Sequence, residues 1–284
     1  MPNLIALLHT GIREEERMIL EKAKELGVAM EPLDARGVVF GSQNRDSFTK
    51  YSLVLQRCVA ANKAENVLWY FEEMGIPVVN SLAISELCKN KFATSLRLFE
   101  KGVPTPRFAL VFNEASALNA VKDLGGFPVV IKPIKGTSWG RLMGKVNDAD
   151  GLEMILEHKE AMGVNHQSFY LQEYINKPGR DIRIYVAQGE VYAAIYRFAP
   201  HWITNTARGA TVEVCPITPE IQELGKKIQS AMGNGLLAVD LFESEQGLLV
   251  NEVNDNMEFK NVVKITGQDV PKKIIEYCLS VMKS

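Results

Sequence analysis

The first part of the chain alternates short apolar runs with amphipathic segments. Leu4–Leu8 is predicted to be a buried strand, and Arg13–Leu26 a helix that ends at Gly27, because its apolar side chains recur at helical spacing. Further strands are predicted at 53–55 and 76–80, with a helix at 63–74 between them. Strands that alternate with helices predict a parallel sheet wrapped by helices, which is an α/β module.

The pattern changes near residue 88. Two short helices are predicted at 81–88 and 91–101, and Gly102–Pro106 then interrupts the helical periodicity. Strands and helices are mixed beyond Phe108, with strands at 129–132, 145–146 and 168–174 and helices at 114–124 and 148–162. This mixture predicts an α+β fold with an antiparallel sheet. We expect a domain boundary near residue 88.

From Arg180 onward the pattern is mainly that of hairpins. Strands at 182–186 and 191–197 flank Gln188-Gly189-Glu190, which is typical of a hairpin turn. A polar segment, 200–211, precedes a helix at 220–232. Strands at 237–242 and 248–251 follow, and a helix at 270–282 closes the chain.

Composition narrows the class of protein. The 284 residues carry 32 basic and 34 acidic side chains, a net charge of −2, and 46% of them are hydrophobic. A soluble globular chain is expected, and the balanced charge argues against a protein whose main partner is nucleic acid. The four cysteines lie far apart without zinc-ligand spacing. No run approaches about 18 uninterrupted apolar residues, so we expect no membrane span and a cytoplasmic location.

A lysine and a glycine-rich loop form the first candidate site. Lys132 ends a β-branched strand, and Gly136-Thr137-Ser138-Trp139-Gly140 follows shortly afterwards. Small residues let backbone N–H groups approach phosphate oxygens, and a lysine adds a positive charge. The spacing matches neither a Walker loop nor a Rossmann fingerprint. The alternative is an ordinary hairpin with one half-buried lysine.

The second candidate site is acidic. Asp240 lies in one predicted strand, and Glu252 and Asn254 end the next. Side chains two residues apart project to the same side of a strand, so Glu252 and Asn254 can share a site. Oxygen ligands from neighbouring strands suit Mg²⁺ beside substrate phosphates. The alternative is a rim of solvated polar residues at strand ends.

A third candidate lies at Phe169–Ile175, where a strand turns from apolar to polar at Gln172 and Glu173. Such a strand can present backbone groups to an adenine edge and a carboxylate to ribose hydroxyls. The alternative is a half-buried strand with a polar exit, which this segment fits equally well when taken alone.

Together these motifs resemble the ATP-grasp superfamily over essentially the whole chain. Within it, four segments are similar to the LysX family of the RimK-like branch: Ser138–Leu142, Gly179–Arg183, His201–Gly209 and Met257–Asn261. The resemblance implies an ATP-grasp fold with an N-terminal α/β pre-ATP-grasp domain at 1–88, a central ATP-grasp subdomain at 89–174 and a C-terminal one at 175–284.

The resemblance also implies an activity. Members of this family use ATP to join the α-amino group of 2-aminoadipate to the C-terminal glutamate γ-carboxyl of a small acidic carrier protein, LysW, through an acyl phosphate. ATP and two Mg²⁺ ions are the expected cofactors. By the resemblance, Asp240, Glu252 and Asn254 hold Mg²⁺, and the ATP-binding residues are Lys91, Lys132, Gly136, Thr137, Ser138, Trp139, Gly140, Arg141, Gln172, Glu173, Tyr174, Ile175, Arg180, Asp181 and Arg183.

Arg197 and Lys132 are the candidate catalytic residues. Arg197 follows a strand into the polar segment, where an aimed guanidinium can stabilise a developing oxyanion; the alternative is a surface arginine in an ion pair. Lys132 can neutralise the transferring phosphoryl group. His201 is expected to pack or bind the carrier rather than act as a base, because an acyl phosphate needs little base catalysis. The expected substrate-binding residues are Arg197, His201, Trp202, Asn205, Thr206, Arg208, Glu258, Phe259, Lys260 and Asn261.

Substrate and partner choice leave alternatives open. The related glutamate ligase ArgX carries Gly-Phe where this chain has Asn261-Val262, and the absence of that Phe leaves room for one more methylene, which favours 2-aminoadipate. A glutamate–LysW ligase, a RimK-like ligase acting on another protein's C-terminus and a non-catalytic nucleotide-binding module are the alternatives. An acidic carrier predicts a basic rim built from Lys177, Arg180, Arg183, Arg197 and Arg208. A homo-oligomer, dimer or tetramer, is expected from the family.

Overall fold

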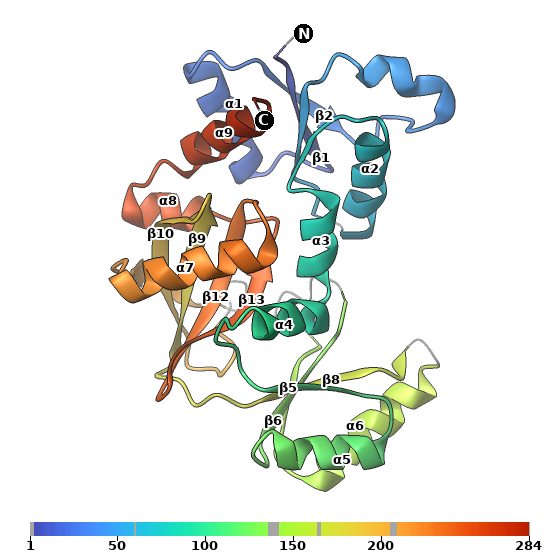
Figure 1. Cartoon of the computed structure of the whole chain (residues 1–284), viewed down its shortest axis with the longest axis vertical. Helices are drawn as coiled ribbons and strands as arrows, with labels where there is room; N and C mark the ends of the chain where they lie inside the picture. Colours follow the sequence, from blue (N-terminus) through green and yellow to red (C-terminus); the bar gives the residue numbers. More distant parts are fainter. Residues whose placement is uncertain (1–2, 60, 136–141, 164–165, 205–208, 284) are drawn as a thin grey trace.

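The computed structural model describes residues 3–59, 61–135, 142–163, 166–204 and 209–283. The described residues form three sheets, which follow one another along the long axis of the molecule in Figure 1. The parallel N-terminal sheet lies at the top, a large antiparallel sheet in the middle and a smaller antiparallel sheet at the bottom. This architecture agrees with the predicted change from an α/β module to α+β subdomains.

The N-terminal unit is a parallel sheet with the strand order β2-β1-β3-β4. Its elements are β1 (Ile5–His9), α1 (Glu14–Glu25), β2 (Met30–Asp34), the 3₁₀ helix η1 (Ser42–Phe48), β3 (Leu53–Gln56), α2 (Ala61–Glu73) and β4 (Val78–Val79). Strand β2 was not predicted because it contains Pro32. At the edge of a sheet proline is tolerated, since the missing N–H faces away from the only neighbouring strand.

The small sheet has the order β5-β8-β6-β7 and is antiparallel throughout. Its elements are β5 (Phe108–Val111), α5 (Glu114–Asp123), β6 (Val129–Lys132), β7 (Gly144–Val146), α6 (Ala149–Ala161) and β8 (Phe169–Glu173). Both helices lie below the sheet in Figure 1 and share a hydrophobic core with it. Lys132 is the last residue of β6, at the end of the sheet that faces the rest of the molecule.

The large sheet has the order β11-β10-β9-β12-β13. Its strands are β9 (Arg180–Ala187), β10 (Glu190–Phe198), β11 (Thr211–Val214), β12 (Leu237–Ser244) and β13 (Gly247–Asn254), and α7 (Pro219–Met232) covers one face. Helices α3 (Leu82–Lys89) and α4 (Lys91–Glu100) contribute to the same core as α7, since Ile84 and Leu98 pack there with β9 and β12 side chains. Lys91 therefore begins a helix anchored on the large sheet.

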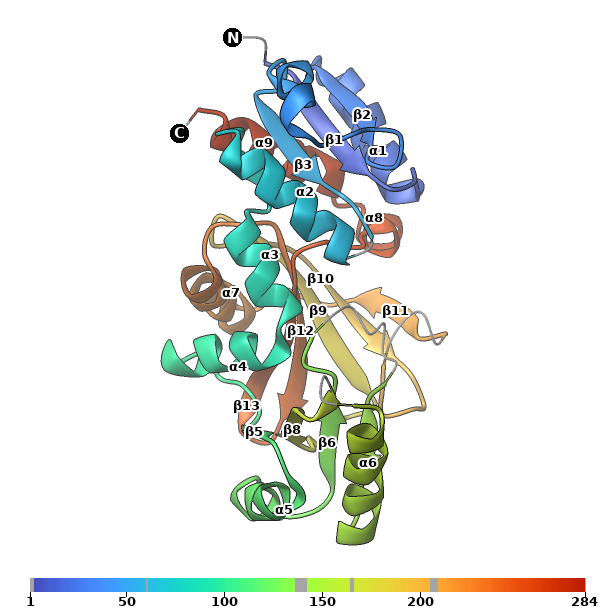
Figure 2. The same ribbon diagram turned by 90° about the vertical axis from the view of Figure 1, so that its right-hand side faces the viewer.

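The C-terminal helices return to the N-terminal unit. Helix α9 (Val270–Val281) packs beside α1, and α8 (Lys260–Thr266) lies between it and the large sheet (Figure 2). One continuous core joins the two regions, because Ile5 and Leu7 of β1 share it with Ile274 of α9 and Tyr185 of β9. The domain boundaries near residues 88 and 174 stay a prediction.

Candidate active site

Two carboxylates and an amide share one face of the β12–β13 hairpin. Asp240 lies opposite Glu252 in the antiparallel register, and Ala238 lies opposite Asn254. Because Glu252 and Asn254 are two residues apart, their side chains project to the same side as Asp240. The predicted metal-binding residues are therefore brought together, on strands that the sequence pattern indicated.

Arginines from β9 and β10 extend this polar face. Arg183 lies opposite Asp240 and forms a bidentate pair with it, with Nε 2.7 Å from Oδ1 and Nη2 2.9 Å from Oδ2. Arg197 Nη2 lies 3.0 Å from Asp240 Oδ2 and 3.5 Å from Asp181 Oδ2. Asp181 also accepts hydrogen bonds from Lys177 and Thr204. Opposite charges thus alternate across β10, β9 and β12, and the Glu252 carboxylate on β13 lies opposite the like-charged Asp240.

Burial makes these charges interdependent. Asp240 and Arg197 are only 5% and 4% exposed. Burial alone would raise the pKa of Asp240, but the guanidiniums of Arg183 and Arg197 outweigh it and hold that pKa well below its ordinary value. Burial likewise opposes ionisation of Glu252, and Lys91 overcomes it and lowers the pKa of Glu252. Both carboxylates are ionised at neutral pH, as metal ligands must be.

Two lysines approach the same face from other elements. Lys91, the first residue of α4, places Nζ 2.5 Å from Glu252 Oε1. Lys132 comes from the small sheet, and its Nζ donates to Gln172 Oε1 at 2.6 Å and to Asn251 Oδ1 at 2.7 Å. The small and large sheets therefore meet at Lys132. We refer to Lys91, Lys132, Asp181, Arg183, Arg197, Asp240 and Glu252 as the polar cluster.

Burial lowers the pKa of Lys132 from 10.5 to about 8. The main cause is desolvation, because the residue is 6% exposed, and the positive charges of Lys91 and Lys177 add to it. A lysine with this pKa is still mainly charged at pH 7 and loses its charge in mildly alkaline solution.

A pH dependence follows from this shift. As pH rises through about 8, Lys132 of the free enzyme loses its proton and attracts phosphate oxygens less, so kcat/KM for ATP is expected to fall. Arginine remains charged across this range, so Lys132→Arg should move the fall to higher pH, whatever its effect on the maximum. Rate profiles from pH 6 to 10 test this. An unchanged alkaline limb in Lys132→Arg would assign it to another group.

Several predicted ATP-binding side chains have partners within the protein. Both oxygens of Glu173 are occupied by Arg107, whose backbone N and Nε each lie 2.7 Å away. Arg180 forms a bidentate pair with Glu243 at 2.6 and 2.7 Å and lies over the Tyr196 ring. Any contact of Glu173 with adenine would therefore come from its backbone. Tyr174 lies beside Trp202, and Ile175 is half-buried.

The Met257–Asn261 motif contacts the N-terminal unit instead of the polar cluster. Glu258 lies 3.5 Å from Arg13, and Lys260 lies 3.9 Å from Glu14. Phe259 is fully buried in the core shared with α1 and α9, and Asn261 is half-buried. His201 is exposed, with Nδ1 accepting from the Ile203 backbone N at 3.0 Å and its ring beside Trp202.

Some predicted site residues lie outside the described part of the chain: Gly136, Thr137, Ser138, Trp139, Gly140, Arg141, Asn205, Thr206 and Arg208. Sequence analysis in turn missed Asn251 as a partner of Lys132. Strict strand alternation predicts that it lies on the opposite side from Glu252, so it was not grouped with the carboxylates. In the structure the register shifts at Asn251, because Asp240 pairs with Glu252 and Leu241 with Val250, and the alternation is interrupted. The signal that could have identified Asn251 is its position, because it is the first polar residue after the apolar run Leu248–Val250.

The predicted basic rim differs from the structure in one respect. Lys177, Arg180, Arg183 and Arg197 each pair with a carboxylate. These four side chains therefore do not supply unpaired positive charge to an acidic partner. The sequence prediction counted the basic residues alone and did not include the carboxylates that neutralise them.

The polar cluster fits Mg²⁺ and a phosphate-bearing substrate. Among the described residues, no three His, Cys, Asp or Glu side chains gather into a ready-made metal cage. Mg²⁺ commonly binds through one or two carboxylates together with substrate phosphates. Glu252 offers one such carboxylate, whose Oε1 is paired with Lys91. Both oxygens of Asp240 already accept from Arg183 and Arg197, so Asp240 would have to release an arginine to bind the metal. In the same described set Arg197 Nε is a buried donor without a partner, as suits a site completed by an oxygen anion.

The chain matches two known family models, which together cover most of its length. Residues 88–278 match the RimK-like ATP-grasp domain, and residues 5–87 match the LysX preATP-grasp domain. The chain belongs to the RimK-like ATP-grasp family. This result confirms the family resemblance, the ATP-grasp fold and the class of enzyme expected from the sequence, an ATP-dependent carboxylate–amine ligase. ATP and Mg²⁺ are the cofactors general to ATP-grasp ligases.

Individual relatives resemble the whole chain. The alpha-aminoadipate–LysW ligase LysX of Saccharolobus solfataricus is 36% identical over 267 residues, which are 93% of this chain and 96% of the relative. The glutamate–LysW ligase ArgX of Sulfurisphaera tokodaii is 29% identical over 284 residues, 96% of this chain and 97% of the relative. A RimK domain ATP-grasp protein of Sphaerobacter thermophilus, 24% identical, superposes with a TM-score of 0.80 over 97% of this chain and 99% of that chain.

No helix in the described ranges is both long enough and apolar enough to cross a bilayer.

Proposed function

We propose that this RimK-like ATP-grasp protein joins the α-amino group of 2-aminoadipate to the C-terminal glutamate γ-carboxyl of a LysW-type carrier protein, with hydrolysis of ATP to ADP and phosphate. The observation that carries the proposal is full-length similarity to a relative named for this reaction, at 36% identity, against 29% for the glutamate-specific relative. The polar cluster supports it, because its charges suit phosphoryl transfer to a carboxylate.

The chemistry requires activation of a poor electrophile. The carrier carboxylate attacks the terminal phosphorus of ATP, ADP leaves, and the acyl phosphate is then attacked by the amine, which loses a proton as the amide forms and phosphate departs. Lys91 and Lys132 neutralise the charge of the phosphates. Arg197 is held rigidly by two carboxylates, so its guanidinium stabilises the oxyanion without reorganisation.

Asp240, Glu252 and Asn254 would hold Mg²⁺, which supplies Lewis-acid stabilisation of the transferring phosphoryl group. We propose two ions. Glu252 has a further role among the protein's own residues, because its carboxylate orients Lys91 at 2.5 Å. Gln172 has a comparable role, since its amide oxygen fixes Lys132 at 2.6 Å.

The adenine and ribose are proposed to lie along the strand exit of β8. Gln172 to Ile175 would offer backbone groups to adenine, and Asp181 would face the ribose. The glycine-rich loop 136–140 with Arg141 is proposed to cover the phosphates. Arg180 and Arg183 act on this site through the carboxylates they pair with, Glu243 and Asp240.

Selection of 2-aminoadipate over glutamate rests on Asn261-Val262, which replaces the Gly-Phe of the glutamate-specific relatives. Val262 is fully buried in the core and Asn261 is half-buried, so the room for one more methylene is proposed to arise through the position of Asn261 and not through direct contact with Val262. The remaining proposed substrate contacts are Arg197, His201, Trp202, Asn205, Thr206 and Arg208. Glu258 and Lys260 face Arg13 and Glu14, and Phe259 is fully buried, so these three are not proposed to touch substrate. A homo-oligomeric state, dimer or tetramer, belongs to this proposal as well.

The proposal is tested by following ADP release with each component omitted in turn. We expect repeated turnover, with ADP in excess over enzyme, only when ATP, Mg²⁺, the carrier and 2-aminoadipate are all present. Without 2-aminoadipate the acyl phosphate step allows at most one ADP per enzyme, and a carrier that lacks its C-terminal glutamate should give none. ADP release with unrelated C-terminal glutamate peptides would favour a RimK-like protein ligase. ATP binding without any ADP would favour a non-catalytic module.

A further inference from the structure

The chain that follows the proposed metal ligands leaves the sheet at once. Strand β13 ends at Asn254 and lies at the edge of its sheet, so it has a neighbouring strand on one side only. Its ladder with β12 also shifts register between Asp240 and Leu241. Past this irregularity three pairs, from Asp240–Glu252 to Ala238–Asn254, hold the end of the strand, so the chain that follows Asn254 also bears on the orientation of its last side chains. That segment, Asp255–Glu258, is held by other parts of the protein.

The N-terminal unit and helix α3 together contact this segment at each of its four residues. The contacts come from positions just after β3 and β4, from α3 and from the residue before α1. They are Asn80 Nδ2 to the Asp255 carbonyl at 2.6 Å, Ser85 Oγ to Asp255 Oδ2 at 2.5 Å, Asn256 Nδ2 to the Cys58 carbonyl at 2.8 Å, Arg57 Nη1 to the Met257 carbonyl at 3.0 Å and Arg13 Nη1 to Glu258 Oε1 at 3.5 Å.

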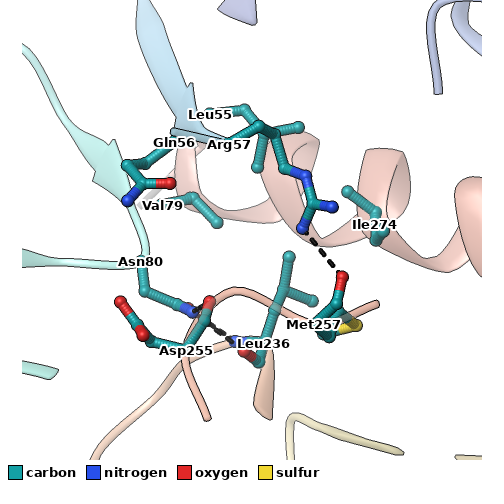
Figure 3. Close-up of a pocket in the computed structure, with 9 residues that line it drawn as sticks. All are labelled: Leu55, Gln56, Arg57, Val79, Asn80, Leu236, Asp255, Met257 and Ile274. Carbon is teal, nitrogen blue, oxygen red and sulfur yellow. Dashed lines mark hydrogen bonds between the residues drawn. The ribbon is translucent and has the colours of Figure 1, made fainter. Parts of the chain in front are cut away.

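Arg57 is the most constrained of these partners. It is 3% exposed, its Nε donates to Glu16 Oε1 at 3.0 Å, and its guanidinium lies over the Phe259 ring. Figure 3 shows it reaching the Met257 carbonyl across a small cavity, with Asn80 and Asp255 on the opposite wall. Burial of a guanidinium costs several kcal/mol, and the hydrogen bonds to Glu16 and the Met257 carbonyl offset part of that cost.

The cavity itself is too small to bind substrate. Its volume is about 10 Å³, which accommodates about one water molecule. The polar groups around it therefore form a joint between two parts of the protein and not a ligand pocket. Arg57 and Asn80 are the members of this joint that hold backbone carbonyls of the 255–258 segment, so they act on the path of the chain.

We propose that Arg57 and Asn80 are positioning residues that fix the 255–258 segment and thereby the orientation of Glu252 and Asn254, so that the N-terminal unit sets the affinity of the active site for divalent metal. This inference rests on the metal-binding role proposed above for those two residues. By this inference the N-terminal unit influences metal affinity although none of its side chains is a proposed metal ligand.

The test is Mn²⁺ binding by electron paramagnetic resonance, with the full chain and a non-hydrolysable ATP analogue. Arg57→Met keeps much of the side-chain volume but removes the bond to the Met257 carbonyl. It should weaken Mn²⁺ binding about tenfold, the lower end of the effect of losing a residue bonded to a metal ligand, because Arg57 acts through the chain and touches no proposed ligand. Ser85→Ala, a smaller change, should weaken it about threefold. Failure of the wild-type protein to bind Mn²⁺ would instead contradict the proposed metal ligands.

Thermal stability and a control variant separate positioning from stability. Glu16 stays paired with Arg13 when Arg57 is replaced, so the Tm of Arg57→Met reports the loss of the Arg57 bonds, and its Mn²⁺ binding should be weak even at temperatures well below that Tm. Phe71→Leu destabilises the same unit without touching the 255–258 segment and should leave Mn²⁺ binding unchanged. The inference is overturned if Arg57→Met binds Mn²⁺ as tightly as the wild type, or if Phe71→Leu loses as much Mn²⁺ affinity as Arg57→Met. If Arg57→Met does not fold, unchanged Mn²⁺ affinity in Ser85→Ala overturns it.

Discussion

Replacing Glu252 with glutamine is expected to reduce kcat/KM for ligation about a thousandfold. Metal stabilisation of a transferring phosphoryl group is worth several kcal/mol, and each 1.4 kcal/mol is about tenfold in rate. The substitution also leaves the Lys91 ammonium without the carboxylate that lies 2.5 Å from it. Glutamine has nearly the same volume, so the loss is one of charge. ADP release measured against Mg²⁺ concentration gives the effect.

The matched control is Glu190→Gln. Glu190 is also a strand carboxylate paired with a lysine, Lys273 at 3.2 Å, but it is 61% exposed and lies outside the polar cluster. This variant should retain the wild-type rate. If Glu252→Gln turned over normally at saturating Mg²⁺, Glu252 would have no place among the metal ligands.

Replacing Asp240 with asparagine is expected to destabilise the fold by about 3–5 kcal/mol, because removal of one partner leaves buried charge uncompensated. Arg183 and Arg197 both depend on this carboxylate, and their side chains are 17% and 5% exposed. The pKa of Asp240 is held below its ordinary value of 3.8, so this stabilisation is present at neutral pH. It is lost as pH falls below that value. Urea denaturation at pH 7 measures the change.

Glu243→Gln is the control for Asp240→Asn. It breaks a bidentate pair on the same strand, but both partners are more exposed, at 29% for Arg180 and 25% for Glu243. Solvent screening limits such a pair to about 1 kcal/mol or less. Equal losses in the two variants would show that burial of the Asp240 pairs adds nothing to their strength.

The strands that carry the site could be predicted because their sequences are locally unambiguous. Leu237–Phe242 and Leu248–Asn251 are short apolar runs around Gln246-Gly247, and in the structure they pair as β12 and β13. The two-residue spacing of Glu252 and Asn254 then fixed their common face. Lys132 was recognised for the same reason, since it ends a β-branched run.

The partners of these residues could not be predicted, because they depend on how distant elements pack. Arg183 meets Asp240 only through the pairing of β9 with β12, and Asn251 meets Lys132 only where two sheets approach each other. Helix α8 was missed for a local reason. Its residues 260–266 include β-branched Val and Thr, which favour helices weakly, and tertiary packing of Val262 in the core decides the conformation.

The most direct test of the proposed activity is a competition experiment. The protein is incubated with ATP, Mg²⁺, the LysW-type carrier and equal concentrations of 2-aminoadipate and glutamate, and the carrier is weighed by mass spectrometry. The proposal predicts a carrier heavier by one 2-aminoadipate residue as the main product. A carrier that gains glutamate instead, or one that gains no mass, would contradict it.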